Sequence, residues 1–356
     1  MRTTTSPRLD HLRRLTDSHG VIHSAQEDFP NRFAGYDTIE NADALRLCAL
    51  ASDTVDADKL HNLAETYYAF LNRARREDAG LLHHCDAMGQ WSNHANDVLV
   101  QSTLARALSA VIVSELPIKM RLSAADWWRE LLAHADHARS PVAAANWLMA
   151  IGLLRDADPG KDLDRAETLA SWLVEDCYYP IRSSDWEWFE SRWAPMAAYI
   201  PAALWHAYTM LGERRYAGVA EVTTSFIIDH LFEGETLVPV GNRGGWSRNT
   251  SKALFDQLPC EVCSMVEMLC IAEHSSGNSV YQGYANNASR WFTGENIQGE
   301  LMIDDQECGC YDALTVTGPD HNQGAAATIS YLLTLAALSV GSQITNASVN
   351  CVAPVG

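Results

Sequence analysis

The stretch from Val238 to Glu261 holds side chains suited to chemistry on an uncharged polar substrate. It contains the turn-rich loop Gly241-Asn242-Arg243-Gly244-Gly245-Trp246 and, beside the start of an apolar helix, Asp256 and Glu261. Adjacent glycines permit positive φ and close backbone approach, so such loops often border a cleft. We therefore interpret this stretch as the mouth of a sugar-sized pocket, in which Trp246 stacks on the ligand.

Both acids of this stretch also have an ordinary structural explanation. Asp256 precedes the helix at a position that suits an N-cap carboxylate. Glu261 lies in the first turn, where the helix dipole favours negative charge. Helix capping and catalysis are therefore alternative interpretations of the two carboxylates.

Acids in other loops favour the catalytic interpretation. Cleavage of a glycosidic bond requires two carboxyl groups, roughly 6.5–9.5 Å apart for inversion and about 5 Å apart for retention. One of them must be protonated at the working pH, which requires burial or a like-charged neighbour. Each acid alone could be a cap or a solvated side chain. The residues that we predict to be catalytic are Asp256, Glu261, Asp37, Asp97 and Glu40.

The segment Asp185–Glu190 reads DWEWFE and places three aromatic rings among three acids. Sugar rings stack on tryptophan, and carboxylates accept hydrogen bonds from hydroxyl groups. The alternative is a helix entry whose tryptophans wedge between helices. The same two interpretations apply to Trp91 and Trp246, and Tyr36 is expected in the core or in the wall of the cleft.

Cysteines and clustered histidines raise the question of a metal. His83, His84 and His94 lie in one irregular stretch, and a Cys260-x-x-Cys263 pair is followed by Cys308-x-Cys310. Neither set has the spacing of a standard metal site, and the first cysteine pair falls on an apolar helix. The chain has no Walker, Rossmann or Gly-x-Ser-x-Gly motif. We expect reduced thiols, no metal and no cofactor.

Charge and composition limit the binding partners and the cellular compartment that we expect. The 356 residues include 26 basic and 45 acidic ones, so the formal net charge is −19. Such a chain repels nucleic-acid phosphates and anionic lipid, and we expect neither nucleic acid nor membrane as a partner. No run of about 18 apolar residues could span a bilayer, and no apolar core of a signal peptide follows the N-terminus. Nine scattered cysteines fit a cytoplasmic protein.

The candidate residues lie in loops between helices. Helical spacing of apolar residues predicts about eleven helices, one of them at 124–138, with traces of strand only near 236–240. Residues 141–154 and 322–340 are apolar on most of the helix circumference, as expected of inner helices walled in by a second ring. Antiparallel helix pairs in this number fit an all-α (α/α)6 toroid. An α-solenoid is the competitor, but no sequence period supports it.

No linker divides the chain. We therefore predict an N-terminal lead-in at 1–19, a single toroid domain at 20–341 and a C-terminal tail at 342–356.

Seven segments occur in the order in which a known family carries them. They are GVIHSAQEDFPNRFAGYDTIENADAL, DWEWFE, PVGNRGGW, FDQLPCEV, ASRWFTGEN, CYDAL and NQGAAATISYLL. The chain resembles bacterial (α/α)6-toroid domains that are fused to glycosyltransferases or encoded beside them, from about Gly20 to Leu338. The resemblance is specific over 239–324 and implies a relative of inverting glycoside hydrolases. Ala326 replaces an acid of the family pattern NQGAES, and we expect Asp37 to compensate for it.

We predict a carbohydrate-active enzyme that uses carboxylate general acid/base chemistry, with inversion favoured, on a glycosidic bond of a glycan or sugar-bearing small molecule. One alternative is a sugar isomerase or epimerase in which His23 or His321 acts as base. Another alternative is a non-catalytic glycan-binding relative. The sequence does not indicate an oligomeric state. The residues expected to bind the substrate are Trp246, Arg243, Asn242, Tyr36, Trp91, Trp188, Asp312, His321 and Gln323.

Overall fold

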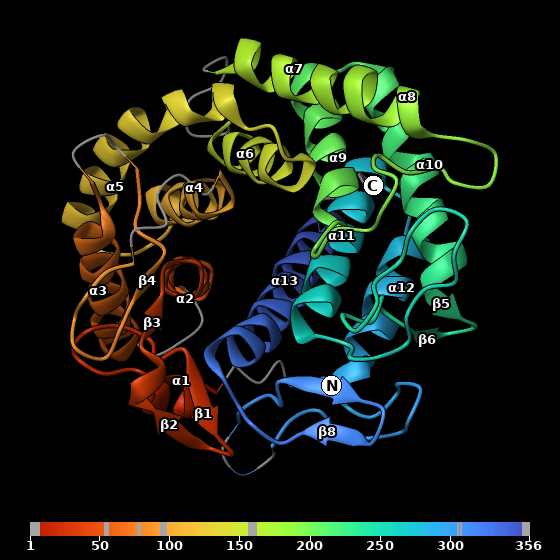
Figure 1. The fold of residues 1–356 in the computed structure, drawn as a ribbon. Coiled ribbons are helices and arrows are strands. Elements are labelled where there is room, and N and C mark those ends of the chain that lie inside the picture. Colours follow the sequence, from red (N-terminus) through yellow and green to blue (C-terminus); the bar gives the residue numbers. More distant parts are fainter. Residues whose placement is uncertain are drawn as a thin grey trace.

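Six helices form a closed inner ring (Figure 1). The computed structural model describes residues 8–52, 57–76, 80–92, 98–155, 162–304, 306 and 308–350, and the ring lies within these ranges. Each inner helix packs against the next, and the last packs against the first. The inner helices are α2 (Thr38–Leu50), α4 (Val98–Val113), α6 (Pro141–Leu154), α9 (Tyr199–Leu211), α11 (Pro259–Ser276) and α13 (Ala325–Asn350).

An outer helix packs on each inner one. The outer helices are α1 (Asp10–Leu15), α3 (Ala57–Ala74), α5 (Ile118–Leu131), α7 (Leu163–Ser171), α10 (Arg214–Leu231) and α12 (Val280–Ser289). A π-helical segment, Trp172–Tyr178, joins α7 to the short α8 (Tyr179–Ile181). The double ring confirms the predicted all-α (α/α)6 toroid, and the contact between α13 and α2 rules out an open solenoid.

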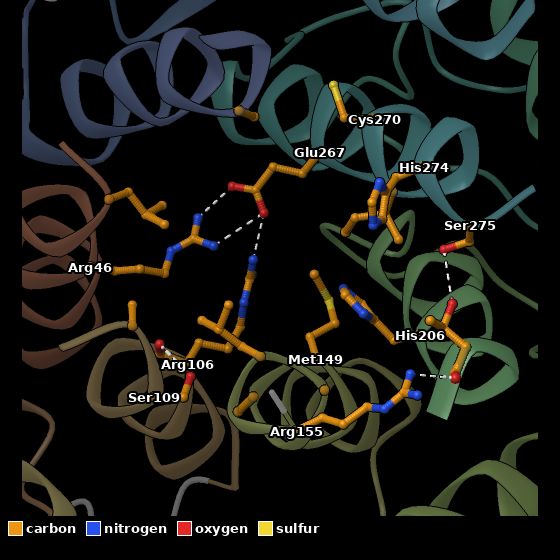
Figure 2. A pocket seen from close by; sticks show the side chains of 18 of the residues that line it. Arg46, Arg106, Ser109, Met149, Arg155, His206, Glu267, Cys270, His274 and Ser275 are labelled. Atoms are coloured by element: carbon orange, nitrogen blue, oxygen red, sulfur yellow. Dashed lines mark hydrogen bonds and ion pairs between the residues drawn. The ribbon is translucent and has the colours of Figure 1, made fainter. Parts of the chain in front are cut away.

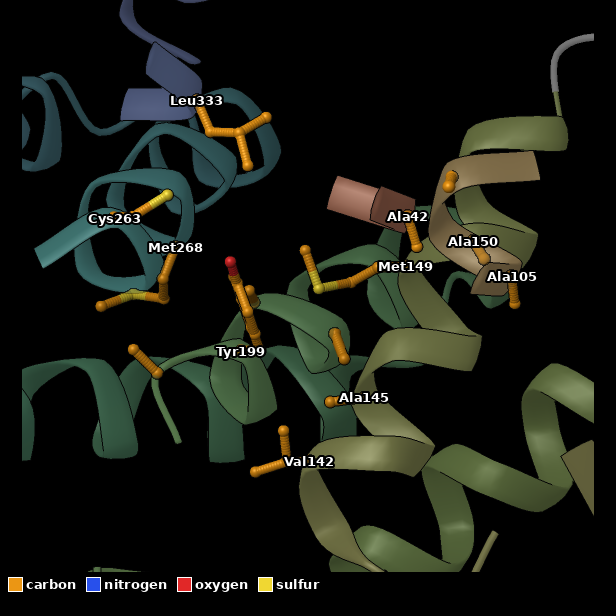
Figure 3. Packing of buried hydrophobic residues seen from close by; sticks show 14 of the residues in the cluster. Ala42, Ala105, Val142, Ala145, Met149, Ala150, Tyr199, Cys263, Met268 and Leu333 are labelled. Atoms are coloured by element: carbon orange, nitrogen blue, oxygen red, sulfur yellow. The ribbon is translucent and has the colours of Figure 1, made fainter. Parts of the chain in front are cut away.

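Small side chains let the inner helices approach one another. Ala105 of α4 and Ala145 of α6 are fully buried. Figure 3 shows such alanines beside larger side chains, among them Met149 and Tyr199, which occupy the space between the helices. A helix that is apolar all round is stable only when other helices surround it, which is why the pattern of 141–154 predicted an inner helix.

The two-stranded sheets of the described chain all lie in loops that lead from an outer helix to an inner one. The reverse connections are shorter: only Gly212 and Glu213 separate α9 from α10. Because the inner helices run in the same direction, the hairpins gather at their N-terminal ends, which we call the mouth. The antiparallel pairs are β1 (Ser24–Gln26) with β2 (Phe29–Asn31), β3 (Tyr36–Asp37) with β4 (His84–Cys85), β5 (Phe232–Glu233) with β6 (Thr236–Leu237), and β7 (Ala313–Thr315) with β8 (Gly318–Asp320).

One helix differs from the sequence prediction. We expected a helix at 124–138, but α5 starts at Ile118 and ends at Leu131. Pro117 occupies its N-cap position, where the fixed φ and missing N–H of proline cost nothing. The last expected turn is a 3-10 segment, Leu132–His137, and further 3-10 turns span Arg32–Ala34 and Arg290–Phe292.

The start of the chain supplies the sixth outer helix. In α1, Leu12 and Leu15 are buried, and the Nε2 atom of His11 lies 2.8 Å from the carbonyl oxygen of Gln323. At the other end, α13 continues as a helix through Asn350. Within the described residues, no helix is long and apolar enough to cross a bilayer.

A buried ion cluster links three inner helices inside the ring. Arg46 of α2 donates to both carboxylate oxygens of Glu267 on α11, at 2.5 and 3.1 Å, and Arg106 of α4 donates to one of them at 2.5 Å. The guanidinium of Arg106 also lies over the ring of Tyr199, 4.2 Å from its centre. Burial alone would raise the pKa of Glu267, but the two arginines outweigh it and hold the pKa at about 2.

We predict that Glu267→Gln destabilises the protein by about 3–5 kcal/mol, because it removes the counter-charge of buried Arg106 and leaves buried Arg46 with Asp43 alone, 3.6 Å away. Urea denaturation of the purified variant measures this loss. Asp126→Asn is the matched control, since the pair of Asp126 with Arg129 is solvent-exposed and should contribute about 1 kcal/mol or less. Equal losses in the two variants would contradict a structural role for the cluster.

Candidate active site

The predicted catalytic acids of the described chain lie at the mouth, together with Asp312, which we predicted to bind substrate. Asp37 and Glu40 begin α2, Asp256 and Glu261 flank the start of α11, and Asp312 lies in the loop before α13. Asp97 lies outside the described residues. A bridge between Gln257 and Leu314 joins the last two of these loops. The acids form two groups, which differ in their surroundings.

The first group borders a cavity of about 280 Å3, which we call the α11 pocket. Glu261 lines it and is buried. One carboxylate oxygen accepts a hydrogen bond from the backbone N–H of Met196 at 2.9 Å, and the other from the indole N–H of Trp193 at 3.4 Å. Burial raises the pKa of Glu261 to about 7 in spite of both donors. A carboxyl group of this kind can give up a proton near neutral pH.

A second carboxyl group, that of Glu190, lines the same pocket. Burial raises its pKa as well, and its buried Oε2 atom has no hydrogen-bond partner in the described structure. Sequence reasoning placed Glu190 in the aromatic segment DWEWFE without selecting it as catalytic. The sequence feature that could have identified Glu190 is its position at the end of that aromatic segment.

Asp256 lies beside this pocket but does not line it. The Oδ2 atom of Asp256 accepts a hydrogen bond from the exposed guanidinium of Arg243 at 3.1 Å. Asn242, which does line the pocket, donates its backbone N–H to the carbonyl oxygen of Asp256 at 2.7 Å. The capping interpretation of Asp256 is wrong, because the N-cap position of α11 belongs to Leu258 and has no side-chain cap.

Close backbone contact brings this loop to the pocket. A side chain on Gly241 would place its Cβ atom 2.3 Å from the carbonyl oxygen of Phe255, so only glycine fits there. Of the paired glycines Gly244 and Gly245, Gly245 lines the pocket, and Gly241 of the same loop lines it as well.

Trp246 and Trp188 do not stack on ligand as we predicted, because both rings are buried. Trp246 packs parallel to Phe226, with centroids 5.5 Å apart, and edge-on to Trp186 at 4.7 Å. Trp188 stacks on Trp193 at 4.6 Å. These rings form an aromatic cluster behind the α11 pocket, so the wedging alternative describes them correctly.

The second group of acids surrounds the start of α2, and we call it the α2 cluster. The Nδ1 atom of His23 lies 2.8 Å from a carboxylate oxygen of buried Glu40, whose other oxygen has no hydrogen-bond partner in the described chain. Asp37 caps α2 through the backbone N–H of Ile39 at 2.7 Å and pairs with His83 at 3.1 Å. Asp37 therefore has the capping role that the sequence offered as an alternative.

Electrostatics couple the members of the α2 cluster. The hydrogen bond to Glu40 is the main reason why the pKa of His23 rises to about 9. Burial raises the pKa of Glu40 to about 7, although His23 opposes this change. Burial also raises the pKa of Asp312 to about 6, against a hydrogen bond from the backbone N–H of Gly324. The cluster thus carries a cationic imidazole beside carboxyl groups that titrate near neutrality.

Three other residues that we predicted to bind substrate have structural contacts instead. Tyr36 is buried and donates its hydroxyl to Asp17 at 2.9 Å. Gln323 is buried and donates to Asp304 at 3.2 Å. Half-buried Trp91 packs on Phe70.

His321 remains accessible at the mouth. It is exposed, and its ring meets the edge of Tyr311 at 4.7 Å.

The cysteine motifs lack the features of a metal site. Cys260 and Cys263 lie on the first turns of α11, and burial raises the pKa of the Cys260 thiol to about 12. Metal binding requires the thiolate, which burial disfavours. Among the residues that the structure describes, no group of three His, Cys, Asp or Glu side chains is arranged to hold a metal ion.

Comparisons with known proteins match the fold rather than the sequence. No protein-family model and no curated protein matches the chain. A sugar epimerase from a ruminal bacterium is 15% identical, with a TM-score of 0.72 over 94% of this chain and 95% of that one. A cellobiose 2-epimerase from Bacillus thermoamylovorans is 13% identical, with a TM-score of 0.73 over 94% and 96% of the chains. A GH76 α-mannanase from Bacteroides thetaiotaomicron is 10% identical, with a TM-score of 0.65 over 94% and 93%.

We predict that Trp246→Ala lowers the free energy of unfolding by about 3–5 kcal/mol, because it leaves a cavity in the aromatic cluster. Denaturant titration followed by circular dichroism measures this change. Phe33→Ala is the control, since this ring is 92% exposed and its removal should cost about 0.5 kcal/mol or less. A stable Trp246→Ala variant that binds sugar poorly would restore the stacking interpretation.

We also predict that Glu40→Gln lowers the pKa of His23 from about 9 by roughly one unit or more, because the carboxylate that favours the imidazolium is lost. An NMR titration of the histidine ring protons measures the shift. Glu235→Gln, in the exposed turn between β5 and β6, is the control and should leave the His23 titration unchanged. An unaltered His23 titration in Glu40→Gln would show that the hydrogen bond to Glu40 does not form.

Proposed function

We propose that the protein is a carbohydrate-active enzyme that holds a sugar unit in the α11 pocket and cleaves its glycosidic bond with Glu261 as general acid. The observation that carries the proposal is a buried carboxyl with a pKa of about 7 in a cavity that contains a second carboxyl group. The cavity of about 280 Å3 is near the lower end of the range for small-molecule sites, roughly 300–1,000 Å3.

The chemistry divides between the two glutamates. Protonated Glu261 donates its proton to the oxygen of the glycosidic bond as that bond breaks. Glu190, in its ionised form, accepts a proton from the water that attacks the sugar carbon, which is the inverting arrangement. Glu190 thus takes the place that the sequence prediction gave to Asp256. Asn242 and Arg192, which line the pocket, are available to bind sugar hydroxyl groups.

Solved structures with this fold support a sugar substrate. Besides those described above, a D-mannose isomerase has a TM-score of 0.72, at 14% identity. These proteins are named for reactions on sugars, although their chemistries differ. The shared substrate class supports the carbohydrate assignment more strongly than it supports hydrolysis.

The α2 cluster favours a second candidate, a sugar isomerase or epimerase. Its supporting observation is the His23 ring, half exposed at the mouth and oriented by buried Glu40. Such a reaction exchanges a carbon-bound hydrogen of the sugar with solvent, whereas glycosidic cleavage creates a new reducing end. NMR of sugar mixtures in D2O separates the two, and a purely binding protein would show neither change.

We predict that Glu261→Gln lowers turnover of the best substrate in a glycoside panel by at least about a hundredfold, because general acid catalysis contributes about 10²–10⁴-fold. Substrate affinity should change little, because the amide still forms hydrogen bonds with hydroxyl groups. Initial rates and calorimetric binding measure the two effects. Glu235→Gln, in the exposed turn between β5 and β6, is the matched control. Turnover that survives Glu261→Gln would move the chemistry to the α2 cluster.

The pH dependence of the free energy of unfolding tests the raised pKa of Glu261 without a substrate. The folded protein holds the Glu261 proton up to a pKa of about 7 rather than 4.5, so this stabilisation is complete below pH 4.5 and is lost as the pH rises through 7. Glu261→Gln should make the decline in the free energy of unfolding smaller, while Glu40 and Asp312, whose pKa values are also raised, maintain the rest of it. The activity of the wild type should fall over the same rise in pH, because the acid loses its proton.

A further inference from the structure

A second cavity lies at the opposite end of the ring from the mouth. Its volume is about 400 Å3, and residues from all six inner helices line it, in the C-terminal half or the middle of each helix. Figure 2 shows Arg46, Arg106 and Glu267 directed into the space between the helices, with His206 and His274 on the other side. The buried ion cluster therefore borders this cavity, which we call the lower cavity.

Three guanidiniums line the lower cavity in a strongly negative protein. Arg46, Arg106 and Arg155 lie there with the carboxylates of Glu267 and Glu273, and Asp43 lies 3.6 Å from Arg46. The chain as a whole carries −19. Arg155 donates to the backbone carbonyl oxygen of Thr209, a neutral group, so its positive charge favours an anion over other solutes.

His206 is a polar group of this cavity that has no hydrogen-bond partner among the described residues. Its ring packs against Gly152, where a Cβ atom would come within 3.1 Å of Nδ1. The ring nitrogens form no hydrogen bond with another described residue, and the side chain lines the cavity. Burial, Arg106 and His274 lower the pKa of His206 to about 4, in that order of importance. The imidazole is therefore a neutral hydrogen-bond donor in a positive environment.

The rest of the wall is apolar. Leu50, Met149, Leu153 and Ile271 line the cavity together with small side chains such as Ala336. Cys270 of the same wall has a pKa raised to about 12, mainly by burial, so it is an uncharged thiol. A ligand that contacts both the polar and the apolar parts of the cavity wall needs one anionic group and an apolar body. An inorganic anion would leave the hydrocarbon part of the wall without contacts.

We propose that the lower cavity is a second ligand site, which binds a small amphiphilic carboxylate with its head at His206 and its apolar body against the inner helices. The carboxylate accepts a hydrogen bond from His206, and Arg106 and Arg155 supply the favourable charge. The site is separate from the α11 pocket and does not depend on the reaction proposed there.

The test measures binding of octanoate to the full-length protein by calorimetry at pH 7, with octanamide as the uncharged match. We expect octanoate to bind about tenfold or more tightly than octanamide, because its hydrogen bonds involve a charge. His206→Phe should lower the affinity for octanoate about tenfold, and Arg155→Gln at the half-buried rim should lower it severalfold. Glu261→Gln at the mouth should leave it unchanged.

NMR of the wild type supplies a measurement that does not depend on a variant folding. Bound octanoate should raise the pKa of His206 from about 4 by at least about one unit, because a negative charge now faces the ring. Binding near pH 5 should therefore be accompanied by uptake of a proton by His206. Equal affinities for octanoate and octanamide, an unchanged His206 titration, or loss of binding in Glu261→Gln would overturn the proposal.

Discussion

The carboxylate of Glu267 sets the orientation of three inner helices. It neutralises two guanidiniums that come from α2 and α4, and all three side chains are buried. A two-pronged contact of this kind fixes the rotation of a helix more strictly than apolar packing does. Glu261 precedes Glu267 on α11 by six residues, which is less than two turns. The rotation that aims Glu267 at the arginines therefore also decides which surface Glu261 faces.

Burial, rather than repulsion between like charges, raises the pKa values of the carboxyl groups at the mouth. Loss of water is the main cause of the raised pKa values of Glu261, Glu190 and Asp312. The aromatic cluster behind the α11 pocket supplies a dry and rigid wall, with Trp193 belonging both to the cluster and to the lining of the pocket. In the proposed reaction the tryptophans thus act on the acidity of Glu261 and Glu190 through the dielectric environment.

The sequence predicted the double ring because inner helices carry a property that is visible locally, an apolar surface on every side. It also pointed to a pocket that Glu261 and Asn242 line, since a paired-glycine loop before a helix is a local signal as well. Trp246 was misassigned because the direction of its ring depends on Phe226, which comes from the outer helix α10. Glu190 was missed because neighbouring acids in one short segment look alike until the fold buries one of them in a pocket.

Closure of the ring has a consequence for how a ribosome makes this chain. The hydrogen bond between His11 and Gln323 spans 312 residues, and the last inner helix must reach the first before the circle is complete. At about 5–20 residues per second, the interval between synthesis of these two residues is roughly 15–60 s. During that time the apolar flank of α2 that α13 will cover lacks its partner helix. The closed ring is therefore completed only after a long period in which the nascent chain exposes apolar surface.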